Sequence, residues 1–318
     1  MAKRKLILKN SEKETRTSYY TINLTDSRLD CIANHPQHVK SATIKGDSYL
    51  SAYGTKIDKL TLLNESKVHF LCDAKIKSLE AYDHSNIWPS CATIKNISMF
   101  MNSSGVIDQD NCDDRQVKVD VIHMYGNAKL EISDCNIDCI YLHDYARLRL
   151  EPGANVKRVV MTGGSNIYSL RGGHIDELVM LGHSDGHVEN MTFGHVKIGK
   201  DASLETFECS FDTAVSSGCL ILENMRKTIK SIKVYGGYTS LCADESRFDD
   251  DYEMANVDLV SAVAGKLYLE CHIANITKLS VSEKCEFDGG ACLDEYVCFL
   301  KWHGKQMDPL HWVISADD

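Results

Sequence analysis

The stretch NVKRVVMTGGSNIYSLRGGHIDELVMLG, residues 155–182, contains two copies of one short pattern. The first copy begins Val156-Lys-Arg-Val159-Val-Met161, and the second begins Ile175-Asp-Glu-Leu178-Val-Met180, 19 residues later. Both place an aliphatic residue first and apolar residues three and five places after it. A repeat of this length is typical of chains built from stacked structural units.

The same template recurs along most of the chain, with a small residue nine places after the start and apolar residues near eleven and thirteen. Successive starts are mostly 18 or 19 residues apart. A fixed period near twenty predicts units that bury their apolar faces only by stacking. The more complete copies start at Ile57, Ile76, Val119, Ile137, Val156 and Ile175, and less complete ones at Val39, Ile94, Phe193, Phe211, Ile229, Val257 and Ile276.

Steps of two between apolar positions within a unit indicate short strands, because a helix would require a spacing of 3.6. Turn residues that tolerate a positive φ recur at one phase of the repeat. The sequence therefore predicts an all-β fold, a single-stranded parallel β-solenoid of about thirteen short coils, with a right-handed coil preferred. The turn pairs are Gly126-Asn127, Asp144-Tyr145, Gly163-Gly164, Gly182-His183 and Gly236-Gly237.

The period sets the expected domain limits. Residues 39–290 form the solenoid, and residues 1–38, with strand-like KLILKN and YYTINLT, form an N-terminal cap. The period stops after Gly289-Gly290, so residues 291–318 are expected to form a C-terminal cap with a short helix or an irregular segment. A leucine-rich repeat has an overlapping period, but its several leucines and fixed Asn or Cys do not recur here.

Composition limits the classes of partner. Asp plus Glu number 45 against 35 Lys plus Arg, a net charge of −10, so neither direct nucleic-acid binding nor a membrane partner is expected. No apolar run is long enough for a bilayer span or a signal peptide, which predicts a soluble, cytoplasmic protein. The 13 cysteines include no C-x-x-C pair, and we expect them to be reduced and mostly buried.

Two spacings exceed the period, from Ile94 to Val119 and from Ile229 to Val257. The surplus residues form acidic segments at one phase of the coil, so both are expected to project from one face. They are either solvated loops or a partner-binding face with two aromatic anchors. The candidate partner-binding residues are Asp108, Asp110, Asp113, Asp114, Asp244, Glu245, Phe248, Asp249, Asp250, Asp251 and Tyr252.

Candidates for chemistry are weaker. His174, His183, His187 and His195 lie close in sequence and could be surface residues at corners or a zinc site. His143 and Asp144 offer an acid/base pair at one corner, but the outward positions show no cluster of carboxylates. No catalytic residue, metal or cofactor is predicted, and the balance favours a protein that is not an enzyme.

The segments IDCIYL, VKRVVM, IDELVM and ITKLSV give the chain its resemblance to the β-solenoid (parallel β-helix) class over residues 39–290. That class includes polysaccharide lyases, viral tailspikes, adhesins and inhibitors that mimic nucleic acid, so the resemblance does not select one function. Our first hypothesis is a non-enzymatic acidic binding protein that occupies or inhibits a basic or nucleic-acid-binding protein, by mimicry of nucleic acid in a phage or host-defence setting. The alternatives are a carbohydrate-binding or carbohydrate-cleaving β-helix and a structural virion component, with self-association as a further option.

Overall fold

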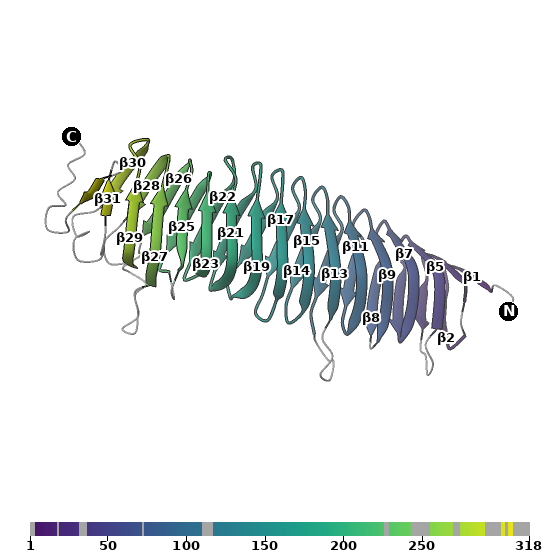
Figure 1. The fold of residues 1–318 in the computed structure, drawn as a ribbon. Helices are drawn as coiled ribbons and strands as arrows, with labels where there is room; N and C mark the ends of the chain where they lie inside the picture. The colour runs from purple at the N-terminus through teal and green to yellow at the C-terminus, as the bar shows by residue number, and fades with distance from the viewer. Residues whose placement is uncertain are drawn as a thin grey trace. The chain divides into compact units, whose positions relative to one another are not determined.

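The computed structural model describes residues 4–17, 19–31, 37–71, 73–109, 117–225, 229–242, 255–269, 274–289, 300–302 and 305–307. They form the predicted parallel β-solenoid, with about 13 stacked coils (Figure 1). Each coil contributes one strand to each of two sheets. The hand of the coil stays a prediction.

The odd-numbered strands and β32 form the first sheet, and the even-numbered strands from β2 to β30 form the second. The first sheet contains β1 (Lys5–Lys9), β3 (Thr21–Thr25), β5 (Gln37–Lys45), β7 (Thr55–Leu63), β9 (Ala74–Ala81), β11 (Ala92–Met99), β13 (Lys118–Met124), β15 (Asn136–Leu142), β17 (Asn155–Met161), β19 (Gly173–Met180), β21 (Met191–Ile198), β23 (Ser210–Ser216), β25 (Ser231–Val234), β27 (Ala255–Ala262), β29 (Ala274–Val281) and β31 (Leu300–Trp302), to which β32 (Lys305–Met307) is added.

The second sheet contains shorter strands, because the template leaves only a few residues between its second corner and the next start. These are β2 (Glu12–Thr15), β4 (Arg28–Cys31), β6 (Tyr49–Tyr53), β8 (Lys67–Leu71), β10 (Asn86–Pro89), β12 (Ser104–Ile107), β14 (Lys129–Ile132), β16 (Arg147–Leu150), β18 (Asn166–Ser169), β20 (Asp185–Glu189), β22 (Ser203–Phe207), β24 (Cys219–Glu223), β26 (Tyr238–Cys242), β28 (Gly265–Leu269) and β30 (Cys285–Gly289).

The chain divides into two compact units. Unit 1 comprises Met1–Val159 and Gly164–Asn166, and unit 2 comprises Val160–Gly163 and Ile167–Asp318. Within each unit, the register places equivalent template positions directly beside one another and buries them. In unit 1 the first three template positions form the rows Ile57/Ile76/Ile94/Val119/Ile137, Leu60/Leu79/Ile97/Ile122/Ile140 and Leu62/Ala81/Met99/Met124/Leu142.

The less complete copies in unit 2 follow the same rule. Phe193 pairs with Phe211, and their buried rings stack with centroids 5.1 Å apart. Ile229 forms a parallel bridge to Val257, and Val257 pairs with Ile276. The same pairing rule spans the long spacing in unit 1, where Ile94 pairs with Val119. Both long spacings are therefore insertions that leave the register of the flanking coils intact.

The step of three at the start of each template corresponds to a bend in the strand. Between the buried Ile57 and Leu60, both Asp58 and Lys59 lie on the outer surface, and the same burial pattern recurs in β9 and β11. Strict alternation would bury one of these two residues. The bend therefore gives the first sheet two neighbouring outward positions in every coil.

The predicted corners adopt left-handed backbone conformations. Gly126, Asp144, Gly163, Gly182 and Gly237 have φ between 58° and 71°. The small template position next to these corners is filled by buried Ser or Ala, as predicted, including Ser66, Ser85, Ala128, Ala146, Ser165 and Ser184.

The strands expected in the N-terminal segment continue the coils. β1 pairs in parallel with β3, β3 with β5, β2 with β4, and β4 with β6. Of the expected C-terminal cap, only residues 300–302 and 305–307 are described, and they form strands. β31 pairs in parallel with β29, and β32 folds back antiparallel on β31, which ends the parallel stacking.

One expectation about the cysteines is wrong. Seven described cysteines have free thiols, but Cys91 is disulfide-bonded. Equivalent residues of adjacent coils stand about 4.8 Å apart, within the Cα separation that a disulfide requires, so cysteines at one place in successive coils can be joined. The repeat assigns Cys72 to the place equivalent to Cys91 in the preceding coil, but Cys72 lies outside the described residues. The described residues include no helix that is long and apolar enough to cross a membrane.

Two adjacent glycines test whether the corner geometry requires glycine. Gly237 has φ of 68°, and a Cβ there would lie 2.1 Å from the carbonyl oxygen of Gly218. A Cβ on Gly236 would meet nothing closer than the Ser217 carbonyl oxygen at 3.6 Å. We expect Gly237→Ala to lower the free energy of unfolding by about 1–3 kcal/mol, and Gly236→Ala to change it by less than about 1 kcal/mol. Urea denaturation measures both, and equal losses would contradict this explanation of the corner.

Candidate partner-binding faces

The acidic segments predicted as a binding face fall almost entirely outside the described residues. Asp108 is described; it follows β12 and is half-buried. The others lie outside: Asp110, Asp113, Asp114, Asp244, Glu245, Phe248, Asp249, Asp250, Asp251 and Tyr252. The proposal that these residues contact a partner therefore stays a prediction.

The described part of unit 2 carries an acidic surface that the sequence analysis missed. It lies on the outer side of the second sheet, over β20 to β30, and we call it the acidic face. Lys266 is the single lysine or arginine among its outward residues, and its Nζ lies 2.7 Å from Glu286. The carboxylates of the acidic face are Asp185, Glu189, Glu205, Glu223, Glu286 and Asp288.

Apolar groups lie among these carboxylates. Tyr238 is 38% exposed, and Ile221 and Tyr268 are half-buried. Tyr238 is in register with Lys266. His187 lies between two carboxylates, with ring nitrogens 3.3 Å from Glu205 and 3.6 Å from Glu189. The acidic face thus combines negative charge with partly exposed apolar side chains, as protein-binding surfaces commonly do.

This face could have been found from the sequence. In the template, positions eleven and thirteen of each even-numbered strand point inward. The residues immediately before, between and after them therefore point outward. Reading those positions coil by coil from residue 185 onward would have collected the same carboxylates. The outward positions considered from the sequence all belong to the first sheet, whereas this face lies on the second.

The first sheet of unit 1 has the opposite charge. Its outer side over β5 to β13 carries many more lysines than carboxylates, and we call it the basic face. The carboxylates on these strands are Asp58, Glu80 and Asp120. The lysines of the basic face are Lys40, Lys45, Lys56, Lys59, Lys75, Lys77, Lys95 and Lys118.

Asp58 holds three of the cations on this face together. Its carboxylate lies 3.0 Å from the Lys77 Nζ, 3.1 Å from the His38 Nε2 and 3.3 Å from the Lys40 Nζ. The hydrogen bond with Lys77, and then those with His38 and Lys40, hold the pKa of Asp58 well below its usual range, although its burial opposes them. The Asp58 side chain is only 10% exposed, so water screens these contacts less than it screens most surface pairs.

A row of flat rings follows the corner of the same sheet. Tyr82, Phe100, Tyr125 and His143 stack in successive coils, with centroids 4.6, 5.1 and 4.8 Å apart and planes within 11° of parallel. We call these four residues the aromatic row. Because each inner ring is covered on both sides, the faces of Phe100 and Tyr125 are not available to a sugar ring or a base.

The two residues of the predicted acid/base pair, His143 and Asp144, both make contacts that hold this corner together. His143 belongs to the aromatic row, and the Asp144 carboxylate accepts a hydrogen bond of 3.1 Å from the Gly126 amide in the preceding coil. Asp144 itself has a left-handed φ of 58°. Its carboxylate therefore caps a corner.

The histidine-rich region does not converge. His174 contacts Asp176 at 2.7 Å, His187 contacts Glu205, and His195 contacts Thr213 at 2.8 Å, each on its own strand or the next. His183 is exposed at its corner. Within the described ranges, no group of three or more His, Cys, Asp or Glu is placed to hold a metal ion.

Buried thiols are poor nucleophiles here. Burial raises the pKa of Cys31, Cys135 and Cys209 to about 12, so these thiols stay protonated near neutral pH. They pack as small apolar side chains in the interior.

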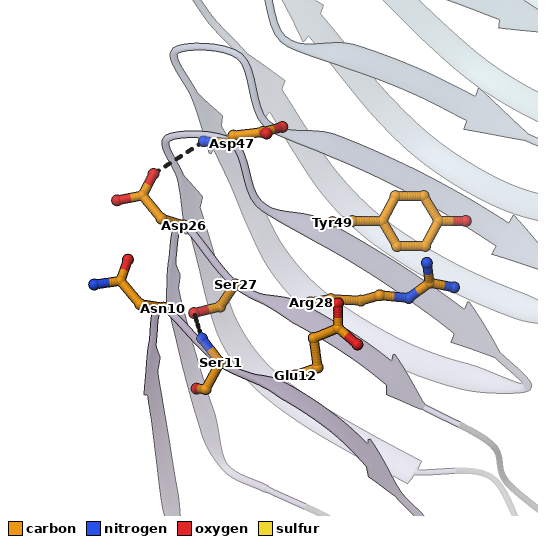
Figure 2. Close-up of a pocket in the computed structure, with 8 residues that line it drawn as sticks. All are labelled: Asn10, Ser11, Glu12, Asp26, Ser27, Arg28, Asp47 and Tyr49. Atoms are coloured by element: carbon orange, nitrogen blue, oxygen red, sulfur yellow. Dashed lines mark hydrogen bonds between the residues drawn. The ribbon is translucent and has the colours of Figure 1, made fainter.

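A recess of about 480 Å³ lies at the first corner of the N-terminal coils (Figure 2). Its polar groups already bind one another. Asp26 accepts a hydrogen bond from the Asp47 amide at 3.1 Å, and the Ser27 hydroxyl accepts one from the Ser11 amide at 3.3 Å. Arg28 lies over the Tyr49 ring and pairs with Asp30 at 2.9 Å. The recess therefore lies between corners that are joined by hydrogen bonds among its own lining residues.

Comparison with protein-family models, curated proteins and solved structures finds no match for this chain. The functional argument therefore depends on the two charged faces.

The lowered pKa of Asp58 predicts a pH-dependent contribution to stability. An unfolded Asp titrates near 3.9, so this contribution is present above about pH 4 and is lost as the pH falls toward the lowered pKa of the folded state. We expect Asp58→Asn to reduce the melting temperature at pH 7, and the difference from the unmodified chain to shrink below about pH 4. Melting curves across pH measure this, with the exposed Asp201→Asn as control. A difference that stays constant down to acidic pH would refute the role of the Asp58 charge.

Proposed function

We propose that this chain is a non-enzymatic binding protein whose acidic surface occupies a basic macromolecular partner. The observation that supports this most directly is the acidic face of unit 2, where the lone Lys266 is paired with Glu286 and the other carboxylates face outward. A surface of one sign attracts a partner of the opposite sign and speeds their encounter.

The rigidity of the scaffold strengthens this proposal. Every coil in unit 2 pairs its backbone with the next, so the outward side chains hold fixed spacings before any partner arrives. Preorganised groups lose less conformational freedom on binding than groups on flexible loops. Ile221, Tyr238 and Tyr268 supply the apolar contacts that charge alone does not provide.

The partner class follows from the same features. A basic protein, including one that normally binds the phosphates of nucleic acid, matches an array of carboxylates with regular spacing. Occupation of such a surface would inhibit that protein by mimicry of nucleic-acid charge. The acidic segments around residues 108–116 and 244–253 are proposed as additional contacts.

The test is affinity capture from a cell lysate followed by binding measurements on the purified partner. The face variant combines Asp185→Asn, Glu189→Gln, Glu205→Gln and Glu223→Gln. The control variant combines Asp47→Asn, Glu65→Gln, Asp201→Asn and Glu283→Gln, four carboxylates outside the acidic face. Both variants have the same net charge, so a difference between them reports position and not total charge.

We expect the intact chain and the control variant to retain the same basic protein, and the face variant to bind it at least about tenfold more weakly, with a smaller dependence on salt. A third variant, with Asp113, Asp114, Asp249, Asp250 and Asp251 changed to Asn, tests the acidic segments separately. Equal capture by all variants would overturn the proposal that carboxylates bind the partner.

A further inference from the structure

The basic face of unit 1 contains a row of cations that the fold does not explain. Register pairing places His38 opposite Lys56, Lys56 opposite Lys75, Lys75 opposite Thr93, and Thr93 opposite Lys118. We call these five residues the lysine row. Neighbouring members stand about one strand spacing apart, near 4.8 Å. Like charges placed directly opposite each other in a sheet are destabilising.

The three lysines of the lysine row, Lys56, Lys75 and Lys118, are exposed and form no ion pair with a described residue. The same holds for Lys95, which lies two places along β11 from Thr93. Several other cations of this face are paired. Lys59 contacts Glu80 at 2.8 Å, and Asp58 binds His38, Lys40 and Lys77. The four ammonium groups without an ion pair to a described residue therefore lie on a chain whose net charge is −10, and of these Lys118 helps to lower the pKa of Asp138.

Polar side chains accompany these lysines on the same surface. Ser41, Lys59, Ser78 and Asn96 form a parallel row in register, three places further along the strands. Hydroxyl and amide groups can donate to and accept from sugar hydroxyls, while the ammonium groups bind acidic substituents. The two rows run parallel across β7, β9 and β11, in the direction in which the coils of unit 1 stack, and Asp58, Lys77 and Lys95 lie between them.

We propose that the basic face of unit 1 is a docking surface for a single chain of an acidic polysaccharide, which lies along the lysine row. Lys56, Lys75, Lys95 and Lys118 bind its sulfate or carboxylate groups. Ser41, Ser78 and Asn96 bind its hydroxyls.

Several features favour a polysaccharide over nucleic acid. The outward residues of β5 to β13 include no arginine, the side chain best shaped to grip phosphate. Single-stranded nucleic acid is usually held by bases stacked on free aromatic faces, and the inner rings of the aromatic row cover one another. The screening length of about 8 Å in physiological salt allows a narrow ligand to experience mainly the local lysines.

The test measures binding of a size-defined heparin oligosaccharide to the full chain by calorimetry at several salt concentrations. The lysine variant combines Lys56→Gln, Lys75→Gln, Lys95→Gln and Lys118→Gln. The matched control combines Lys129→Gln, Lys197→Gln, Lys233→Gln and Lys278→Gln, four exposed lysines on other strands. An oligogalacturonate and a short DNA duplex are measured in parallel.

We expect heparin to bind the intact chain and the control alike, and the lysine variant about tenfold to a hundredfold more weakly. The melting temperature of the lysine variant should not fall, because the substitutions remove repulsion, and this excludes unfolding as the cause of lost binding. Binding of the oligogalacturonate with the same lysine dependence would extend the ligand to carboxylated chains.

Three outcomes would overturn the proposal. These are an absence of heparin binding at low salt, equal loss in both variants, and tighter binding of the DNA duplex through the same lysines. The acidic face of unit 2 takes no part in this test, so its result is independent of the function proposed above.

Discussion

The structure depends on one constraint, the in-register hydrogen bonding of parallel strands between successive coils. It places each residue beside its equivalent in the next coil, at about one strand spacing. Inside the solenoid, apolar residues of the same type therefore pack against one another without a free-energy penalty. Ile57, Ile76 and Ile94 form one such row, and the buried rings of Phe193 and Phe211 stack in another. This fold therefore requires that residues at equivalent positions of successive coils pack favourably against one another.

That constraint explains why so much of the fold could be predicted from the sequence. A translation of 18 or 19 residues preserves every inward position, so the period, the strands, the corners and even weak copies such as Ile229 could be found. The first two coils were harder, because β1 and β2 follow the template poorly. The fold-back of β32 depends on local contacts outside the repeat.

The candidate site was less predictable for a different reason. Loops that interrupt the period are conspicuous in a sequence, and they drew the partner-binding prediction to residues that the structure mostly does not describe. The charged faces lie on regular strands, where each coil contributes only one or two residues. Asp185, Glu205 and Glu223 are ordinary surface carboxylates until the register brings their strands together. A surface of this kind becomes visible only when outward positions are read across coils.

Net charge is also a poor guide when a solenoid separates its charges. A value of −10 argues against a polyanion for the whole molecule, yet ions screen surface charge over about 8 Å. A ligand therefore senses the residues beneath it. Over β5 to β13 the charged residues are mainly lysines, and over β20 to β30 they are mainly carboxylates. One acidic chain can thus present surfaces suited to partners of opposite sign.

Outward rows differ in whether equivalent side chains of successive coils attract or repel one another. Rows whose members attract one another stabilise the fold, whereas a row whose members repel one another calls for a functional explanation. The aromatic row stabilises the sheet, since stacked rings attract one another. The row that contains Lys40 and Lys77 is compensated, because Asp58 sits between them in register. The lysines of the lysine row, two residues away on the same strands, have no such carboxylate in register with them. Since compensation was achieved at the neighbouring position, the uncompensated row is not an unavoidable result of the fold. A like-charge row that costs stability and is left uncompensated is most simply explained by a ligand that supplies the missing charge.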